Sequence, residues 1–199
     1  MSQDVFDIMR TMRPMRRLKS DPVPQALVEE ILDAGTWAPN SLNIQPYRFV
    51  VVRDPKAKAF FGERYDAAMS KGFERMVPAA TDDSPRARNV RRALAFAKEV
   101  KDVPLLIVVC GLRDWPFAVP ESERHGVAPP SYGSVYPCIQ NILLACRAKG
   151  LGASLTTMHQ VFESELCREL EIPDEFGPVG RRPSREFTYL DRWVREPYA

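Results

Sequence analysis

The sequence predicts a single α+β domain over residues 1–199, an α/β sandwich in which helices cover both faces of one sheet. Helical and strand-like patterns alternate along the chain, but their connections are too irregular for repeated βαβ units. An unbroken apolar run at residues 103–110 has strand length and indicates a central strand buried on both faces. A chain of 199 residues is also long enough to bury one full core.

The first third of the chain is expected to hold two helices and one strand. Apolar residues recur at helical spacing over 4–12, and Pro14 ends that helix. A second amphipathic helix is predicted over 24–37, because Pro24 suits a first helical position and an apolar stripe follows it. Residues 47–52 have the composition of a buried strand.

The middle third continues the alternation. We expect a moderately amphipathic helix over 56–74, a loop over 76–88 rich in proline and aspartate, and a helix over 89–101. The apolar strand at 103–110 follows. Residues 111–130 lack periodicity and contain four prolines, which is typical of a long surface loop or a lid.

The last third is expected to begin with a helix over 134–149. It is apolar nearly all round, and Gly150 ends it. A strand is predicted over 153–157, where two adjacent threonines have good β-propensity, and a short helix over 163–170.

Charge and composition exclude several classes of partner. Lys and Arg number 28, Asp and Glu 26, and a net charge of +2 gives no reason to expect nucleic acid or a membrane as partner. We find no apolar run of membrane-span length and no signal-peptide pattern, so a cytoplasmic protein is expected.

The reactive side chains form no familiar catalytic or metal-binding pattern. The four cysteines are widely spaced in apolar segments, which favours buried thiols over disulfides or metal ligands. Two histidines exclude a multi-histidine metal site, and no Ser-His-Asp or Cys-His arrangement is visible. We therefore predict no metal and no catalytic side chain. The chain also lacks the G-x-G-x-x-G motif of a dinucleotide-binding fold.

A polar loop between Pro39 and Pro46 is the most informative stretch. Four of its side chains can form hydrogen bonds, more than a simple reversal of direction requires. The loop is either an ordinary solvated connection or a surface that binds the polar edge of a flat ligand.

A basic cluster at residues 13–17 also allows two interpretations. Three arginines in five residues commonly form a solvated turn, but arginine is also suited to bidentate binding of phosphate.

Three segments resemble the flavin-dependent nitroreductase family. Residues 38–49 (APNSLNIQPYRF) are similar to the family's A-P-S-x-x-N-x-Q-P-W-x-F signature, with Asn40 and Tyr47 replacing the usual Ser and Trp. Residues 11–18 (TMRPMRRL) are similar to its R-x-S-x-R-x-F element, with Pro14 in place of Ser. Residues 136–153 resemble its Q-N-x-x-L-A-A…G-L-G segment. The resemblance covers nearly the whole chain.

The resemblance implies bound FMN and assigns its binding residues. In the family the basic element and a late basic residue bind the FMN phosphate, while the polar loop and the residues after G-L-G lie beside the flavin ring. Carried over residue by residue, the implied set is Arg13, Pro14, Met15, Arg16, Asn40, Ser41, Asn43, Gln45, Leu155, Thr156, Thr157, Arg181 and Arg182. Trp115 and Phe117 become candidate lid residues, but ordinary loop packing is the favoured role for each.

The implied activity is a two-electron reduction of nitroaromatics or quinones by NADH or NADPH in alternating half-reactions. The implied assembly is an intertwined homodimer with a mixed, mainly antiparallel sheet, a C-terminal arm over 177–199, and the 40–45 loop facing the partner's flavin. Reductive dehalogenation, oxidative breakdown of flavin and non-enzymatic flavin binding remain alternatives.

The sequence departs from the family pattern after Phe176. There the resemblance implies one more apolar strand and its turn, yet Phe176 runs directly into a Gly-Pro-Arg segment. Either the protein has lost this strand or the sequence omits it, and we favour the second alternative.

Overall fold

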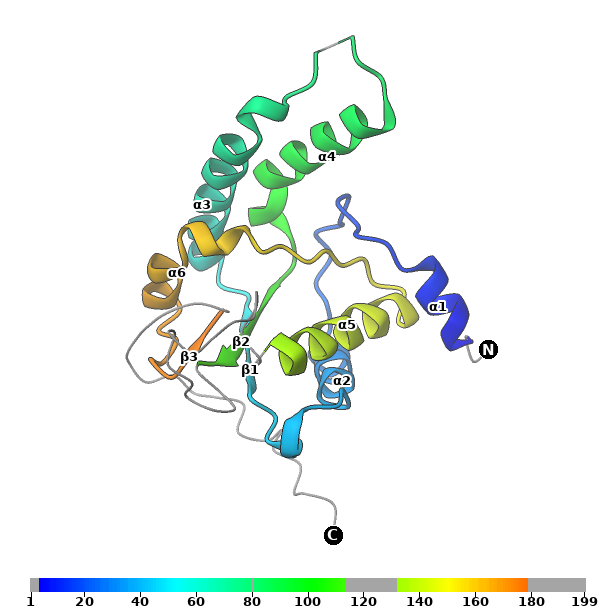
Figure 1. Ribbon diagram of the computed structural model, residues 1–199, viewed down its shortest axis with the longest axis vertical. Helices are drawn as coiled ribbons and strands as arrows, with labels where there is room; N and C mark the ends of the chain where they lie inside the picture. The colour runs from blue at the N-terminus through cyan, green and yellow to red at the C-terminus, as the bar shows by residue number, and fades with distance from the viewer. Residues whose placement is uncertain (1–3, 80, 114–131, 179–199) are drawn as a thin grey trace, which may run out of the picture.

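The computed structural model describes residues 4–79, 81–113 and 132–178. Its sheet has three strands in the order β1-β2-β3: β1 (Tyr47–Val52), β2 (Leu106–Leu112) and β3 (Phe176–Gly177). Both pairings are antiparallel, with Tyr47 opposite Gly111 and Val52 opposite Leu106. Helices lie on both sides of this sheet, so the α+β prediction is confirmed (Figure 1).

The two faces of the sheet support two separate cores. Against one face pack α3 (Pro55–Phe73), α4 (Pro85–Glu99) and α6 (Glu163–Glu169). Against the other pack α2 (Gln25–Thr36) and α5 (Tyr132–Ala148). Successive side chains of β2 alternate between these cores, as strand geometry requires.

The contact between α2 and α5 depends on a glycine. A Cβ atom at Gly35 would lie 2.8 Å from Cγ1 of Ile142, closer than real side chains approach. Beside it, the Asn141 amide donates a 3.2 Å hydrogen bond to the Ala34 carbonyl near the end of α2. These two features hold α2 closely against α5.

Several predicted boundaries differ from the structure for identifiable reasons. The helix expected from residue 89 begins at Pro85, because the Ser84 side chain accepts a hydrogen bond from Ala87 N and caps α4. β2 starts at Leu106 and continues through Leu112, so the loop expected from residue 111 begins later. A short 3-10 helix, η3 (Val100–Asp102), precedes β2.

The prediction of a strand over residues 153–157 is wrong. Residues 151–157 are neither helix nor strand, and the short helix η5 (Met158–Val161) follows them. The Ala153 carbonyl accepts a hydrogen bond from Met15 N, not from a strand of the sheet. Threonine propensity suggested a strand here, but a tertiary contact with the N-terminal segment determines the conformation.

The N-terminal helix α1 (Val5–Thr11) extends from the body of the molecule (Figure 1). It has no buried residue, and Phe6 remains 74% exposed. Two further 3-10 helices are η1 (Ser41–Asn43) and η2 (Glu74–Met76).

Four predicted site or lid residues lie outside the described ranges: Trp115, Phe117, Arg181 and Arg182. β3 is short and follows α6, in the region where the sequence lacks an expected strand.

Candidate functional site

Two segments far apart in the sequence meet at the candidate site. The backbone N–H of Met15 donates a 2.8 Å hydrogen bond to the carbonyl of Ala153. Gly152 permits this approach: a Cβ there would lie 2.7 Å from Cδ2 of Leu18 and 3.3 Å from Cβ of Met15. The basic N-terminal segment therefore lies directly on the chain that leaves α5.

A cavity of about 610 Å³ opens beside this junction. Its walls include the N-terminal segment (Met15, Arg17–Lys19), the junction segment (Gly150–Thr157), α5 and the apolar strand β2. Phe96 and Val100, at the end of α4 and the start of η3, close another side. Its volume is within the range of cofactor and ligand sites, which are concave and mainly apolar.

The structure brings only part of the predicted FMN-binding set to this cavity. Met15, Leu155, Thr156 and Thr157 line it. The following predicted residues do not line it: Arg13, Pro14, Arg16, Asn40, Ser41, Asn43 and Gln45. The predicted set thus falls into a group at the junction and a group on the polar loop.

The arginines of the N-terminal segment differ in their surroundings. Arg13 donates to the carbonyls of Arg10 (2.8 Å) and Met12 (2.6 Å), and so satisfies acceptors near the end of α1. Arg16 is half-buried, directly after the Met15 amide that contacts Ala153. Arg16 thus follows the hydrogen-bonded Met15 directly, whereas the Arg13 side chain is bound to the end of α1.

The threonines of the junction segment are not equivalent. The Thr156 hydroxyl accepts a 3.3 Å hydrogen bond from Met158 N at the start of η5. Thr157 is exposed at the cavity wall, and no hydrogen bond from its side chain caps η5. Leu155 presents an apolar side chain that is 47% exposed. This wall therefore combines hydroxyl groups with an apolar surface.

The polar loop is a strained structure held together by Asn40. The Asn40 side chain accepts from Gln45 N at 2.8 Å and donates to the Ala38 carbonyl at 3.3 Å. Leu42, Asn43 and Gln45 have φ values of 53°, 53° and 51°, in the left-handed region that non-glycine residues seldom adopt. Such backbone strain is concentrated at functional sites. Asn40 organises the loop, while Ser41 and Asn43 are exposed.

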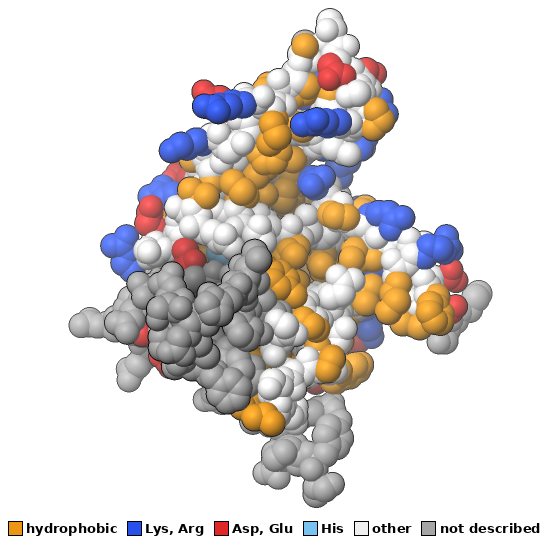
Figure 2. Space-filling model, in the orientation of Figure 1, with side chains coloured by type: hydrophobic (Ala, Val, Ile, Leu, Met, Phe, Trp, Pro, Cys, Tyr) orange, Lys and Arg blue, Asp and Glu red, His pale blue; other side chains and the backbone are white. Residues whose placement is uncertain are grey.

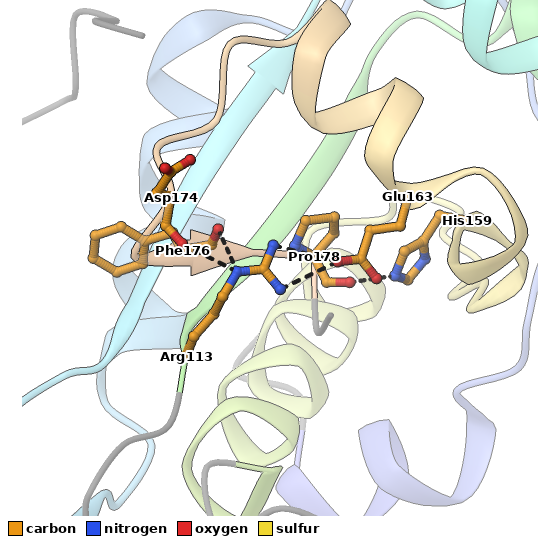
Figure 3. Close-up of polar contacts among 6 residues, drawn as sticks. All are labelled: Arg113, His159, Glu163, Asp174, Phe176 and Pro178. Atoms are coloured by element: carbon orange, nitrogen blue, oxygen red, sulfur yellow. Dashed lines mark hydrogen bonds and ion pairs between the residues drawn. The ribbon is translucent and has the colours of Figure 1, made fainter. Parts of the chain in front are cut away.

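A polar network that sequence analysis missed lies at the end of β2 (Figure 3). The Arg113 guanidinium contacts Glu163 Oε1 at 3.3 Å, and its Nε donates to the carbonyls of Asp174 (3.2 Å) and Phe176 (3.1 Å). The side chains of Arg113 and Glu163 are only 13% and 11% exposed. Burial raises the pKa of Glu163, although the guanidinium of Arg113 opposes that shift.

His159 continues this region toward the cavity, which it lines. Its Nε2 lies 2.7 Å from the Pro178 carbonyl oxygen (Figure 3). Burial lowers the pKa of His159, so the neutral ring donates Nε2–H to that carbonyl at pH 7. His159 thereby holds Pro178 at the cavity, which both residues line. No spacing motif in the sequence indicates this role.

The prediction of buried thiols is confirmed, because all four cysteines are buried and unpaired. Burial raises the pKa of Cys138 to about 12 and that of Cys146 to about 11. Within the described ranges, no group of three potential ligands could hold a metal ion. No helix of that part of the chain is long and apolar enough to cross a membrane.

Helices surround a small antiparallel sheet, and a cavity lies at the junction of two segments. The model of the nitroreductase family matches residues 10–180. The chain belongs to the nitroreductase family.

Comparisons with individual proteins agree with this family. The chain is 48% identical over 58 residues to the "NADH dehydrogenase" of Thermus thermophilus, a match that covers 27% of this chain and 28% of that protein. It is 26% identical over 168 residues to "Putative NAD(P)H nitroreductase YfhC" of Bacillus subtilis, covering 84% and 76% of the two chains. The crystal structure of oxidized iodotyrosine deiodinase bound to FMN and 3-iodo-L-tyrosine superposes with a TM-score of 0.67 at 22% identity, covering 98% of this chain and 100% of that one. That structural likeness shows the shared fold.

Proposed function

We propose that this protein is an FMN-dependent oxidoreductase that passes two electrons from NADH or NADPH to a nitroaromatic or a quinone. The observation that carries the proposal is the junction of the Met15–Leu18 and Leu151–Thr157 segments beside a cavity, in a chain whose family match spans residues 10–180. The name of the B. subtilis relative supports the donor, and the FMN of the deiodinase structure supports the cofactor.

The residues at the junction suit FMN. The hydrogen bond from Met15 N to the Ala153 carbonyl holds the two segments together, and a Cβ at Gly152 would push against the Leu18 side chain beside it. Arg16 and Arg13 would hold the phosphate, with Pro14 and Met15 between them. Arg181 and Arg182, outside the described residues, are proposed to add to this charge. When bound, FMN would supply the two-electron chemistry that the protein's own side chains lack.

The residues that line the cavity would then contact the flavin ring. Leu155 would exclude water from one side of the ring, and the hydroxyls of Thr156 and Thr157 would offer neutral hydrogen bonds to its polar edge. Neutral groups can stabilise a change of charge on a cofactor without adding a fixed charge of their own.

We also propose that two copies of the chain form the working unit. The polar loop does not line the cavity of its own chain, so Asn40, Ser41, Asn43 and Gln45 would reach the flavin of the partner. Apolar side chains exposed on and beside this loop and on α1 support a second copy as the occupant: Phe6, Met9, Trp37, Leu42 and Ile44. The four unpaired thiols support a reducing, cytoplasmic setting for this dimer.

The test begins with the purified protein. Mass analysis of the released cofactor is expected to give FMN, and anaerobic NADH or NADPH is expected to bleach the flavin spectrum. Addition of a nitroaromatic or a quinone should restore the spectrum over repeated cycles. A different cofactor, or a flavin that neither donor bleaches, contradicts the proposal.

The same assay separates the alternative activities. Oxidation of the reduced protein by 3-iodotyrosine with release of iodide, faster than by any nitroaromatic or quinone, would identify a dehalogenase. Loss of FMN on aerobic incubation of the reduced protein would identify flavin breakdown.

A substitution at Arg16 tests the proposed phosphate site. Arg16→Ala is expected to weaken FMN binding by roughly ten- to a hundred-fold, as for loss of a hydrogen bond to a charged group. Arg10→Ala is the matched control, because Arg10 is an exposed arginine on α1 that pairs with Asp7. Equal effects of the two variants would remove Arg16 from the site.

A further inference from the structure

The mouth of the cavity carries positive charge that the FMN assignment does not use. α4 has five basic side chains and one acidic side chain, in a protein whose net charge is only +2. Arg88 donates to the backbone carbonyl of Asp83, just before α4, and Arg91 forms an ion pair with the Asp83 carboxylate. Within the described ranges, Arg92 is exposed and its guanidinium makes no ion pair.

Helix periodicity places Arg92 beside the cavity. Phe96 and Val100 line the cavity, and side chains four residues apart in a helix lie on the same side. Arg92 is one turn before Phe96 and therefore continues this row from the buried wall to the exposed rim. Asn89, seven residues before Phe96 and also exposed, lies on the same side.

A second set of cations lines the cavity from the N-terminal segment. Arg17 and Lys19 belong to its wall, together with one carboxylate, Asp21, and all three are exposed. Figure 2 shows Lys and Arg side chains on both sides of the hollow between α4 and this segment. An anion entering the cavity would thus pass between two positively charged edges.

We propose that Arg92, with Arg17 and Lys19 opposite it, binds the phosphate groups of the dinucleotide donor. This inference rests on the proposed function, since it assumes that NADH or NADPH delivers electrons to a flavin in the cavity. Guanidinium groups bind phosphate through two hydrogen bonds, and a rim of cations around a cavity also speeds the arrival of anions. The apolar wall below the rim, which includes Phe96, would then accept the nicotinamide ring.

The experiment measures flavin reduction in the FMN-loaded protein by anaerobic stopped flow. Arg92→Gln is expected to raise the apparent Kd for NADPH by about ten-fold, the loss of one charge-assisted contact, and to leave the limiting reduction rate unchanged. A neutral donor without phosphates, 1-benzyl-1,4-dihydronicotinamide, should reduce both proteins equally. For the unaltered protein, the apparent Kd for NADPH should rise with ionic strength, because salt screens exposed charges.

Lys98→Gln provides the matched control. Lys98 is an exposed cation on α4, but it lies nearly opposite Phe96 around the helix, away from the cavity. Equal effects of Lys98→Gln and Arg92→Gln would show that only the overall charge of α4 matters, which overturns the proposal. An equal loss of reactivity toward the neutral donor would also overturn it, because it would show a structural defect.

Two further outcomes distinguish failure of the donor-binding proposal from failure of the proposed function. If Arg92→Gln leaves the Kd for NADPH unchanged but weakens reaction with 4-nitrobenzoate, the rim binds a carboxylated oxidant and the donor proposal is wrong. If neither NADPH nor the neutral donor bleaches the flavin of the unaltered protein, the proposed function itself fails, and this inference fails with it.

Discussion

At the scale of single residues, Arg113 joins three parts of the described structure. Its backbone N–H donates to the Glu175 carbonyl, and its side chain reaches Glu163 and two further carbonyls. It thus connects the end of β2 to α6 and to the segment that forms β3. A partly buried ion pair of this kind contributes little by itself, but removal of one partner leaves an uncompensated charge.

Arg113→Met is therefore expected to lower the free energy of unfolding by about 3 kcal/mol at pH 7, because the Glu163 carboxylate loses its cation in a buried site. Glu163→Gln should cost less, since Arg113 keeps its two carbonyl acceptors. Urea unfolding of both variants and of the double variant measures the difference.

The pH dependence of the Arg113→Met variant has a defined sign. Burial already raises the pKa of Glu163, and loss of Arg113 raises it further. A raised pKa means that the folded state binds the proton more tightly than the unfolded state, so folding is favoured at low pH and disfavoured as pH rises. The deficit of Arg113→Met should shrink between pH 7 and pH 5. A deficit that is constant over this range would contradict the assignment.

At the scale of elements, the decisive contact joins two irregular segments. The residues after α1 and those after α5 meet at Gly152, where an added Cβ atom would come within 2.7 Å of the Leu18 side chain. This contact, and not a strand of the sheet, determines the path of residues 151–157 beside the cavity.

Gly152→Val is expected to separate these segments and to weaken FMN binding by roughly ten-fold or more, at a cost of about 1–3 kcal/mol in stability from overpacking. Gly133→Val is the control, because nothing lies within 4 Å of a Cβ at Gly133. Fluorescence titration of the apoprotein with FMN and urea unfolding measure the two effects. Equal FMN affinity in the two variants would show that the junction is not part of the cofactor site.

At the scale of the whole molecule, the two cores keep four thiols away from solvent. Cys138 and Cys146 belong to the core beneath α2 and α5, and Cys110 and Cys167 to the core beneath α3, α4 and α6. Neither core contains a disulfide, so the stability of the described domain rests on packing across the sheet.

Alkaline pH is therefore expected to destabilise the protein. The pKa of Cys146 is raised from 9.0 to about 11 in the folded state, so the folded state retains its thiol proton more tightly than the unfolded chain does. The corresponding stability is complete below pH 9 and is lost progressively between pH 9 and pH 11. Unfolding measured across this range should show the loss, and Cys146→Ala should reduce it. Rapid reaction of the native thiols with a disulfide reagent at pH 8 would contradict their burial.

Sequence periodicity by itself determined which sides of several elements are buried. Apolar residues at helical spacing indicated which face of α2 is buried, and the run 103–110 indicated a strand covered on both faces. The apolar segments around the cysteines likewise predicted buried thiols. Burial of a face and burial of a thiol both depend on near neighbours in the chain. The motif resemblance indicated the family and a set of candidate residues.

Only the tertiary structure decided how these parts meet. The contact between Met15 and Ala153 and the network around Arg113 join residues that are distant in sequence. Where α4 packs decides which of its residues, Phe96 among them, line the cavity. Hydrophobic periodicity encodes which side of an element is buried, but not which other element covers it. Residues 153–157 show the consequence: their local propensity favours a strand, but Ala153 accepts a hydrogen bond from Met15 and the segment forms an irregular wall of the cavity instead.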